Sequence, residues 1–108
     1  MADSHYRFIY DDRLGIHIPE LDVEWHQYSE EEQAAILLKW EMIRGSIPDR
    51  VKYFERRIQV KQEQLNREED FEESCRLNSA IAELASCIND LNLWYRVNQG
   101  VESSRVHR

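Results

Sequence analysis

Apolar residues recur at alternating intervals of four and three near the C-terminal end of the chain, and this spacing constrains the fold more than any other feature. The residues of this seam are Leu77, Ile81, Leu84, Ile88, Leu91 and Tyr95. Such spacing places one apolar line along the side of an α-helix. Asp70 precedes the seam as a helix cap, and Glu73 completes a capping box. We therefore predict a helix over residues 71–98.

A second apolar line precedes the first and predicts a partner helix over residues 47–66. Pro48 lies in its first turn, a position that proline tolerates well. Because few residues separate the two helices, they are expected to lie antiparallel as a hairpin. The expected core of this hairpin is Val51, Phe54, Ile58, Leu65, Phe71, Leu77, Ile81, Leu84, Ile88 and Leu91.

A shorter helix is predicted over residues 30–44. Ser29 can cap it, Glu32 completes a capping box, and Gly45 follows its end. Its apolar residues form two stripes, Ala35, Leu38 and Met42 on one side and Ile36, Trp40 and Ile43 on the other. A helix that is apolar on two sides is expected to be covered on both.

The N-terminal residues 5–18 read as a small β-hairpin, because apolar and polar residues alternate on either side of a turn at 11–15. Pro19 is expected to close the second strand. An isolated two-stranded hairpin is marginally stable, so this one should rest on the helices or on a second subunit. The connector over 19–28 is expected to be irregular, with Leu21, Val23 and Trp25 turned inward.

Composition supports one mainly α domain. The chain has 108 residues, of which 42% are hydrophobic and 32% charged, with three Gly and two Pro. This is too apolar for a disordered chain and too poor in turn residues for a many-stranded β fold. We expect a single helical domain over 1–100, consisting of the antiparallel helical hairpin, the shorter helix and the β-hairpin, with a flexible tail over 101–108.

The sequence predicts a cytoplasmic protein without a membrane partner. No stretch approaches the ~20 apolar residues that a membrane-spanning helix needs, and the first residues do not resemble a signal peptide. Cys75 and Cys87 lie twelve residues apart on one predicted helix, which separates them by about 18 Å. They cannot form a disulfide with each other, and we expect reduced, partly buried thiols.

No pattern of catalytic or metal-binding residues is present. The histidines His5, His17, His26 and His107 do not share the spacing of three or four that places two ligands on one helix face. Glycine-rich phosphate loops and nucleophile motifs are absent from the sequence. We therefore expect no enzymatic activity, no metal and no cofactor.

The charge distribution disfavours nucleic acid as a partner. The net charge is −7, and residues 1–46 carry ten acids against four bases. A short basic ridge on the predicted helix 47–66 includes Lys52, Arg56 and Arg57 between Arg50 and Lys61. This ridge is expected to exchange charges with Glu55, Glu63 and the acidic last helix. The alternative is a docking surface for an acidic protein.

The last helix is predicted to extend about two turns beyond its partner. There Leu93, Trp94 and Val97 place apolar groups outside the seam. The β-hairpin, the first helix or another subunit could cover them. Since exposed apolar patches usually mark interfaces, we expect a homodimer with these three residues at or beside the contact. The competing account is that Tyr6, Phe8 and Trp25 fold over this end.

Residues 54–88 resemble the UVR motif, a short antiparallel helical hairpin of bacterial excision-repair subunits and Clp-associated proteins. The opening Asp70-Phe71-Glu72 matches the motif, as do the later apolar positions Leu77, Ile81 and Leu84, and Ile58 and Leu65 match its first helix. Ser74 and Cys75 replace paired alanines, Asn78 and Ser79 replace an Arg-Asp pair, and Gln62 replaces an apolar residue. The resemblance implies pairing with another protein and no chemistry of its own.

Together these patterns predict a small bacterial adaptor or regulator that binds another protein through its helical hairpin. Two alternatives remain. A nucleic-acid-binding regulator would use the ridge over 50–61, and its affinity would fall steeply with salt. An acidic inhibitor would use the N-terminal half as a mimic of a polyanion.

Overall fold

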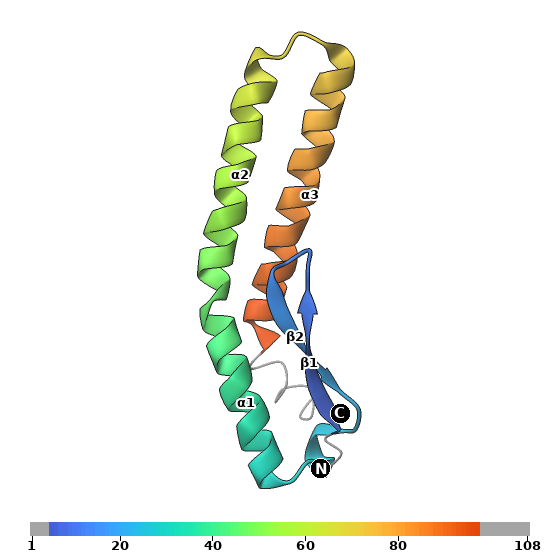
Figure 1. Ribbon diagram of the computed structural model, residues 1–108, viewed down its shortest axis with the longest axis vertical. Helices are drawn as coiled ribbons and strands as arrows, with labels where there is room; N and C mark the ends of the chain where they lie inside the picture. Colours follow the sequence, from blue (N-terminus) through green and yellow to red (C-terminus); the bar gives the residue numbers. More distant parts are fainter. Residues whose placement is uncertain (1–4, 98–108) are drawn as a thin grey trace.

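The computed structural model of the chain describes residues 5–97 and is an elongated helical hairpin with a small β-hairpin against its base (Figure 1). In chain order the elements are β1 (Tyr6–Asp11), β2 (Ile16–Leu21), the 3-10 turn η1 (Trp25–Gln27), α1 (Glu30–Gly45), α2 (Ile47–Arg67) and α3 (Phe71–Tyr95). The predicted class, mainly α with an N-terminal β-hairpin, is confirmed. The expected tail over 101–108 lies outside the described residues.

Strands β1 and β2 form a two-stranded antiparallel sheet, in which Phe8 lies opposite Pro19. The chain turns at Gly15, whose φ is 79° and whose amide donates to the Asp11 carbonyl at 2.7 Å. Strand β2 continues to Leu21, so the prediction that Pro19 closes the strand is wrong. Both strands of a two-stranded sheet are edge strands, where a residue without an N–H is tolerated.

Local capping explains where the helices begin and end. In α1 the Ser29 hydroxyl accepts from the Glu32 amide at 3.0 Å, while the Glu32 carboxylate accepts from the Ser29 amide at 2.9 Å. Helix α3 ends at Tyr95, where the Arg96 amide donates to the Leu93 carbonyl at 3.2 Å. This bond spans three residues, as in a tightened last helical turn. The predicted end at residue 98 lies outside the described residues.

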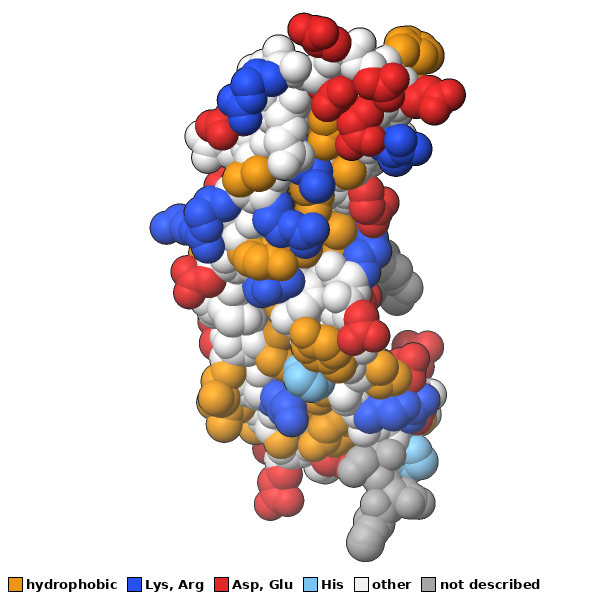
Figure 2. Space-filling view, turned by 45° about the horizontal axis from the view of Figure 1, so that its top comes forward, with side chains coloured by type: hydrophobic (Ala, Val, Ile, Leu, Met, Phe, Trp, Pro, Cys, Tyr) orange, Lys and Arg blue, Asp and Glu red, His pale blue; other side chains and the backbone are white. Residues whose placement is uncertain are grey.

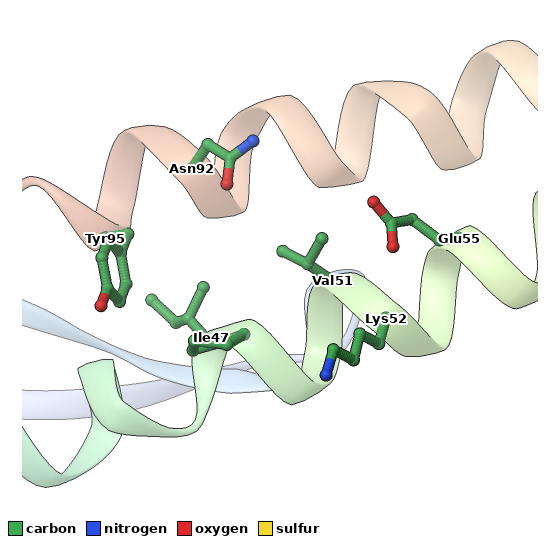
Figure 3. A pocket seen from close by; sticks show the side chains of 7 residues that line it. Ile47, Val51, Lys52, Glu55, Asn92 and Tyr95 are labelled. Carbon is green, nitrogen blue, oxygen red and sulfur yellow. The ribbon is translucent and has the colours of Figure 1, made fainter.

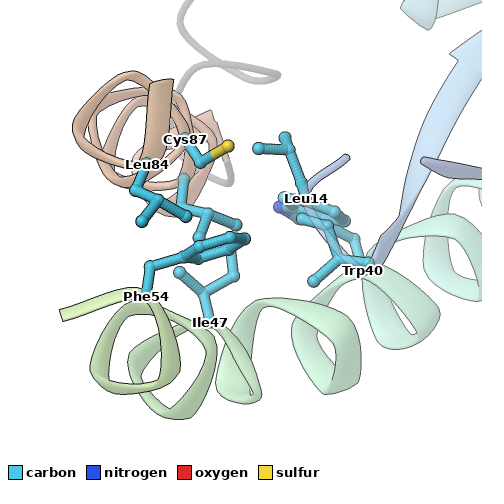
Figure 4. Close-up of a cluster of buried hydrophobic side chains, with 8 residues drawn as sticks. Leu14, Trp40, Ile47, Phe54, Leu84 and Cys87 are labelled. Carbon is cyan, nitrogen blue, oxygen red and sulfur yellow. The ribbon is translucent and has the colours of Figure 1, made fainter. Parts of the chain in front are cut away.

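The main core lies where the β-hairpin, α1 and the α2–α3 hairpin meet, at the base of the molecule (Figure 4). Its buried residues are Leu14, Ile16, Trp40, Ile47, Phe54, Leu84, Cys87 and Leu91. A second cluster, formed by Trp25, Tyr28 and Ile36, anchors the connector between β2 and α1. The expectation that the apolar residues of this connector turn inward is confirmed.

Two apolar groups predicted to be covered are exposed. Phe71 is 79% exposed and does not belong to the hairpin core, because it lies six residues before Leu77 and therefore about 120° round the helix from the seam. On α1 only the Trp40 side packs against the core. Leu38 and Met42 are 67% and 72% exposed, so the prediction that α1 is covered on two sides is wrong.

The last turns of α3 are covered from within the chain. Trp40 of α1 and the β-hairpin residues Leu14 and Ile16 belong to the cluster that contains Leu91. Partly buried residues packed against this cluster include Phe8, Trp94 and Val97, whereas Tyr6 and Trp25 belong to the second cluster. Of the covers that the sequence left open, this structure uses α1 and the β-hairpin.

Candidate protein-binding surface

The α2–α3 hairpin has two flanks, and the tip of the β-hairpin occupies one of them. Arg13, in the β1–β2 loop, donates to Glu83, Ser86 and Asp90 of α3, at 2.7 Å in each case. On the α2 side, the Arg50 Nε donates to the Leu14 carbonyl at 3.0 Å. We call this side the β-covered flank.

The contacts of Arg13 also shape the chemistry beneath the tip. Hydrogen bonds to Glu83 and Asp90 raise the pKa of Arg13 further above its ordinary value, so its charge is permanent. The Cys87 thiol lies below, 3.9 Å from the Arg13 carbonyl, and burial raises the pKa of this thiol although the positive charge of Arg13 opposes the shift. A protonated, covered thiol is a poor nucleophile.

A groove of about 270 Å³ lies beside the tip on the β-covered flank. It is lined by Arg13, Phe54, Arg57, Lys61, Ala80, Glu83, Leu84 and Cys87. Figure 2 shows basic side chains gathered across the middle of the visible face, with hydrophobic atoms between them. This groove therefore combines an apolar floor with a rim that is mostly cationic.

The opposite flank, which we call the open flank, carries a larger groove of about 390 Å³ at the base of the hairpin. Figure 3 shows Ile47 and Val51 of α2 and Tyr95 of α3 around this groove, with the β-strands behind the helices. Arg44 fixes Tyr95, because its guanidinium lies 4.3 Å from the centre of the ring and its Nε donates to the Tyr95 carbonyl at 2.6 Å. The lining residues are Ile47, Pro48, Val51, Lys52, Glu55, Asn92 and Tyr95.

The structure does not gather Lys52, Arg56 and Arg57 into one ridge. Lys52 lines the groove of the open flank, whereas Arg57 lines the groove of the β-covered flank. Arg57 lies over the Tyr53 ring, 5.6 Å from its centre. Among residues 5–97 none of the three forms an ion pair with a carboxylate. The predicted exchange of charge with Glu55 and Glu63 is therefore absent from the described part of the chain.

The predicted apolar contact residues also separate. Leu93 is half exposed, whereas Trp94 and Val97 pack against the main core. The sequence placed Arg50 on the basic ridge and assigned no contact to Arg13, whereas in the structure these two arginines dock the β-hairpin. The sequence does contain both partners of the contact, since Arg13 lies in the predicted turn and α3 carries a line of polar residues. No local pattern, however, indicates that these two segments meet.

Comparisons with protein-family models, curated proteins and solved structures gave no match. Within residues 5–97 no helix is both long and apolar enough to cross a membrane. The same part of the chain contains no cluster of three or more His, Cys, Asp or Glu side chains able to hold a metal ion.

Proposed function

We propose that this chain is a protein-interaction module that binds another protein through its α2–α3 hairpin and performs no chemistry of its own. The observation that carries the proposal is the projection of the hairpin beyond the core. The main cluster reaches only to Ile58 on α2 and Leu84 on α3, and both helices continue past these residues to the apex. Leu77 is buried there between two helices that Figure 1 shows without further cover.

A hairpin that projects beyond the core adds little to stability, and its exposed surface is available to a partner. The radius of gyration is 18.3 Å, whereas a compact domain of ~100 residues has about 13 Å. Two helices that contact only each other bury little apolar surface per residue, and here they also expose Val60 and Phe71. Exposed apolar groups on an extended arm are typical of a docking surface. The resemblance of residues 54–88 to the UVR motif supports the same function.

Charge favours a protein partner over nucleic acid. On the β-covered flank Glu83 lies among Arg13, Arg57 and Lys61, and Lys52 lies apart on the open flank, so a phosphate backbone would not contact an unbroken cationic track. Figure 2 also shows acidic side chains gathered at the apex, where the chain carries Glu68, Glu69, Asp70, Glu72 and Glu73. Binding of an oligonucleotide that weakens steeply with rising salt would support the nucleic-acid alternative instead.

Quantitative affinity capture from the source cells tests the proposal. The tagged full chain is compared with Val60→Asp on the hairpin and with Leu38→Asp, a matched change at an exposed apolar residue of α1. We expect a partner protein that Val60→Asp loses and Leu38→Asp retains.

A third variant, Glu30→Lys with Glu31→Lys, reverses charge in the acidic N-terminal half. Loss of the partner in this variant alone would favour the acidic-inhibitor alternative.

A further inference from the structure

Helix α3 carries a heptad line without charged residues, which shares Ile81, Ile88 and Tyr95 with the seam and otherwise runs beside it. Its members alternate in spacing of three and four: Phe71, Ser74, Asn78, Ile81, Ala85, Ile88, Asn92 and Tyr95. Ser74, Ile81 and Ile88 are half-buried, and the other five members are exposed without charge in a chain of which 32% of the residues are charged. A heptad line of this kind is typical of a helix that packs against a further helix.

This line lies on the open flank. Asn92 and Tyr95 line the groove there, and Phe71, Asn78 and Ala85 precede Asn92 at intervals of seven. All five of these residues are exposed. The β-hairpin instead docks onto the polar line of α3, through Glu83, Ser86 and Asp90. The chain therefore covers the charged side of α3 and leaves its uncharged line open.

Helix α2 forms the other half of the same face, and its two charged residues at the groove have opposite signs. Val51 is half-buried and lines the groove together with Asn92 and Tyr95 of α3. Lys52 and Glu55, which line the groove, are of opposite sign and lie one turn apart. A second copy of this face would thus meet both a cation and an anion on α2, and no net repulsion arises.

We infer that the open flank binds a second copy of the chain, with the two hairpins antiparallel and α3 packed against α3 in a four-helix bundle. A two-fold axis across the middle of α3 makes the contact self-complementary. It pairs Phe71 with Tyr95, Ser74 with Asn92 and Ile81 with Ala85 of the other copy. The contact differs from the one expected at Leu93, Trp94 and Val97, because Trp94 and Val97 already pack within the chain.

The pairing gives Phe71 a place to bind. Among residues 5–97 this side chain is the most exposed of the large hydrophobic ones, at 79%. Its counterpart across the axis is Tyr95, which borders the groove of about 390 Å³, large enough to hold a phenyl ring. Aromatic side chains that fill a pocket are common anchors of interfaces. Each copy therefore supplies one aromatic anchor and one groove, separated by the length of α3.

Charge favours the antiparallel arrangement, and the area of the face suits a dimer. A parallel dimer would stack the two acidic apices, which both carry Glu68, Glu69 and Asp70, whereas the antiparallel dimer places them at opposite ends. Helix α3 has 25 residues, so two such helices side by side offer a face of ~38 Å by ~18 Å, or ~700 Å² per copy. Stable interfaces bury about 800 Å² per partner.

Sedimentation equilibrium of the full chain tests this inference, over concentrations from low micromolar to near millimolar. We expect a species of twice the chain mass of 13.0 kDa. Phe71→Ser and Ala85→Arg should each weaken the dimer at least tenfold. Two controls, Val60→Ser on the far side of α2 and Ser79→Arg on the polar line of α3, should leave it unchanged. A wild type that stays monomeric, or a dimer that the controls weaken equally, overturns the inference.

Thiol cross-linking gives a second, independent measurement. In a Cys75→Ser background, Ala85→Cys should be cross-linked to its counterpart by a short bismaleimide, whereas Ser79→Cys should not. The reverse pattern would overturn the inference. The inference rests on the proposed function only in using the same hairpin, and the two fail separately. If the chain is a monomer and still captures a partner protein, the inference is wrong and the proposed function is supported. If it is a dimer and captures no other protein, the proposed function is wrong and the inference is supported.

Discussion

The indole rings of Trp40 and Trp94 meet edge to face, with their centres 5.8 Å apart and their planes at 65°. This contact joins α1 to the end of α3 and closes the core over the last turns of the hairpin. Trp40 is 1% exposed, and its Nε1 has no acceptor among the described residues. An unpaired buried donor is destabilising, so packing against Trp94 and its neighbours is what holds Trp40 in place.

Replacing Trp94 by Ala should lower the free energy of unfolding by about 2–4 kcal/mol, somewhat below the range for fully buried aromatic residues. Leu93→Ala is the matched control, because the neighbouring side chain is half exposed and makes no contribution to the main cluster. Urea unfolding at low protein concentration measures both. Equal effects of the two changes would mean that Trp94 does not anchor α3 to α1.

Truncations along α3 should show a graded loss of stability. Leu84→Ala removes a buried core side chain and should cost about 2–5 kcal/mol. Ile81 is half-buried on the seam, so Ile81→Ala should cost less, about 1–2 kcal/mol. Phe71→Ala should change the stability of the monomer by less than ~0.5 kcal/mol, since the ring is exposed. A larger loss for Phe71→Ala than for Leu84→Ala in urea unfolding would contradict the burial described above.

Two glycine substitutions should have opposite signs. Gly15→Ala places a side chain at a φ of 79° and against the guanidinium of Arg50, so it should destabilise the protein by about 1–3 kcal/mol. Gly45→Ala lies in α1 with open space around the new methyl group, and it should stabilise by about 0.5–1 kcal/mol. Thermal unfolding of the two variants checks both signs. If Gly15→Ala melts as the wild type does, the tight turn against Arg50 is not maintained.

The two thiols should differ in reactivity. Cys75 is exposed and should react readily with iodoacetamide, whereas Cys87 is buried and its pKa is raised. Because the thiolate is the nucleophile, labelling of Cys87 should require a higher pH. Arg13→Ala should accelerate this labelling, since the tip of the β-hairpin would no longer be held over Cys87. This gain in access should exceed the opposing effect of losing a positive charge that lowers the pKa of the thiol. Mass spectrometry of the labelled peptides measures both rates, and an unchanged Cys87 rate in Arg13→Ala would show that Arg13 does not hold the tip down.

The raised pKa of Cys87 also fixes the sign of a pH effect on stability. In the unfolded chain a cysteine ionises near pH ~8.5, whereas folded Cys87 stays protonated to higher pH. The contribution of Cys87 to stability is therefore complete below the pKa of the unfolded thiol, and it is lost as the pH rises through the higher pKa of the folded thiol. Cys87→Ala should flatten the fall in melting temperature above pH ~8.5. If the melting temperature of Cys87→Ala falls as steeply as that of the wild type, groups other than Cys87 cause the fall.

The sequence by itself determined the features that depend on neighbours a few residues apart. The predicted Ser29–Glu32 capping box is present at the start of α1. At the start of α3 only half of the predicted box forms, because the Asp70 carboxylate accepts from the Glu73 amide but the Asp70 amide donates to Glu68. The heptad seam correctly predicted that Leu84 and Leu91 are buried, because i+3 and i+4 spacing alone places them on one side of a helix. Antiparallel packing followed from the short connector.

Only the tertiary structure decided which surfaces are covered. Arg13 contacts Glu83 across 70 positions of the chain, and no local pattern specifies a contact between residues so far apart. That contact places the β-hairpin on the charged side of α3, opposite the groove that Asn92 and Tyr95 line. In the same way, Trp40 and Leu38 are both large apolar residues of α1, yet only Trp40 faces the core. Periodicity defines the sides of a helix, whereas burial depends on what long-range packing brings against each side.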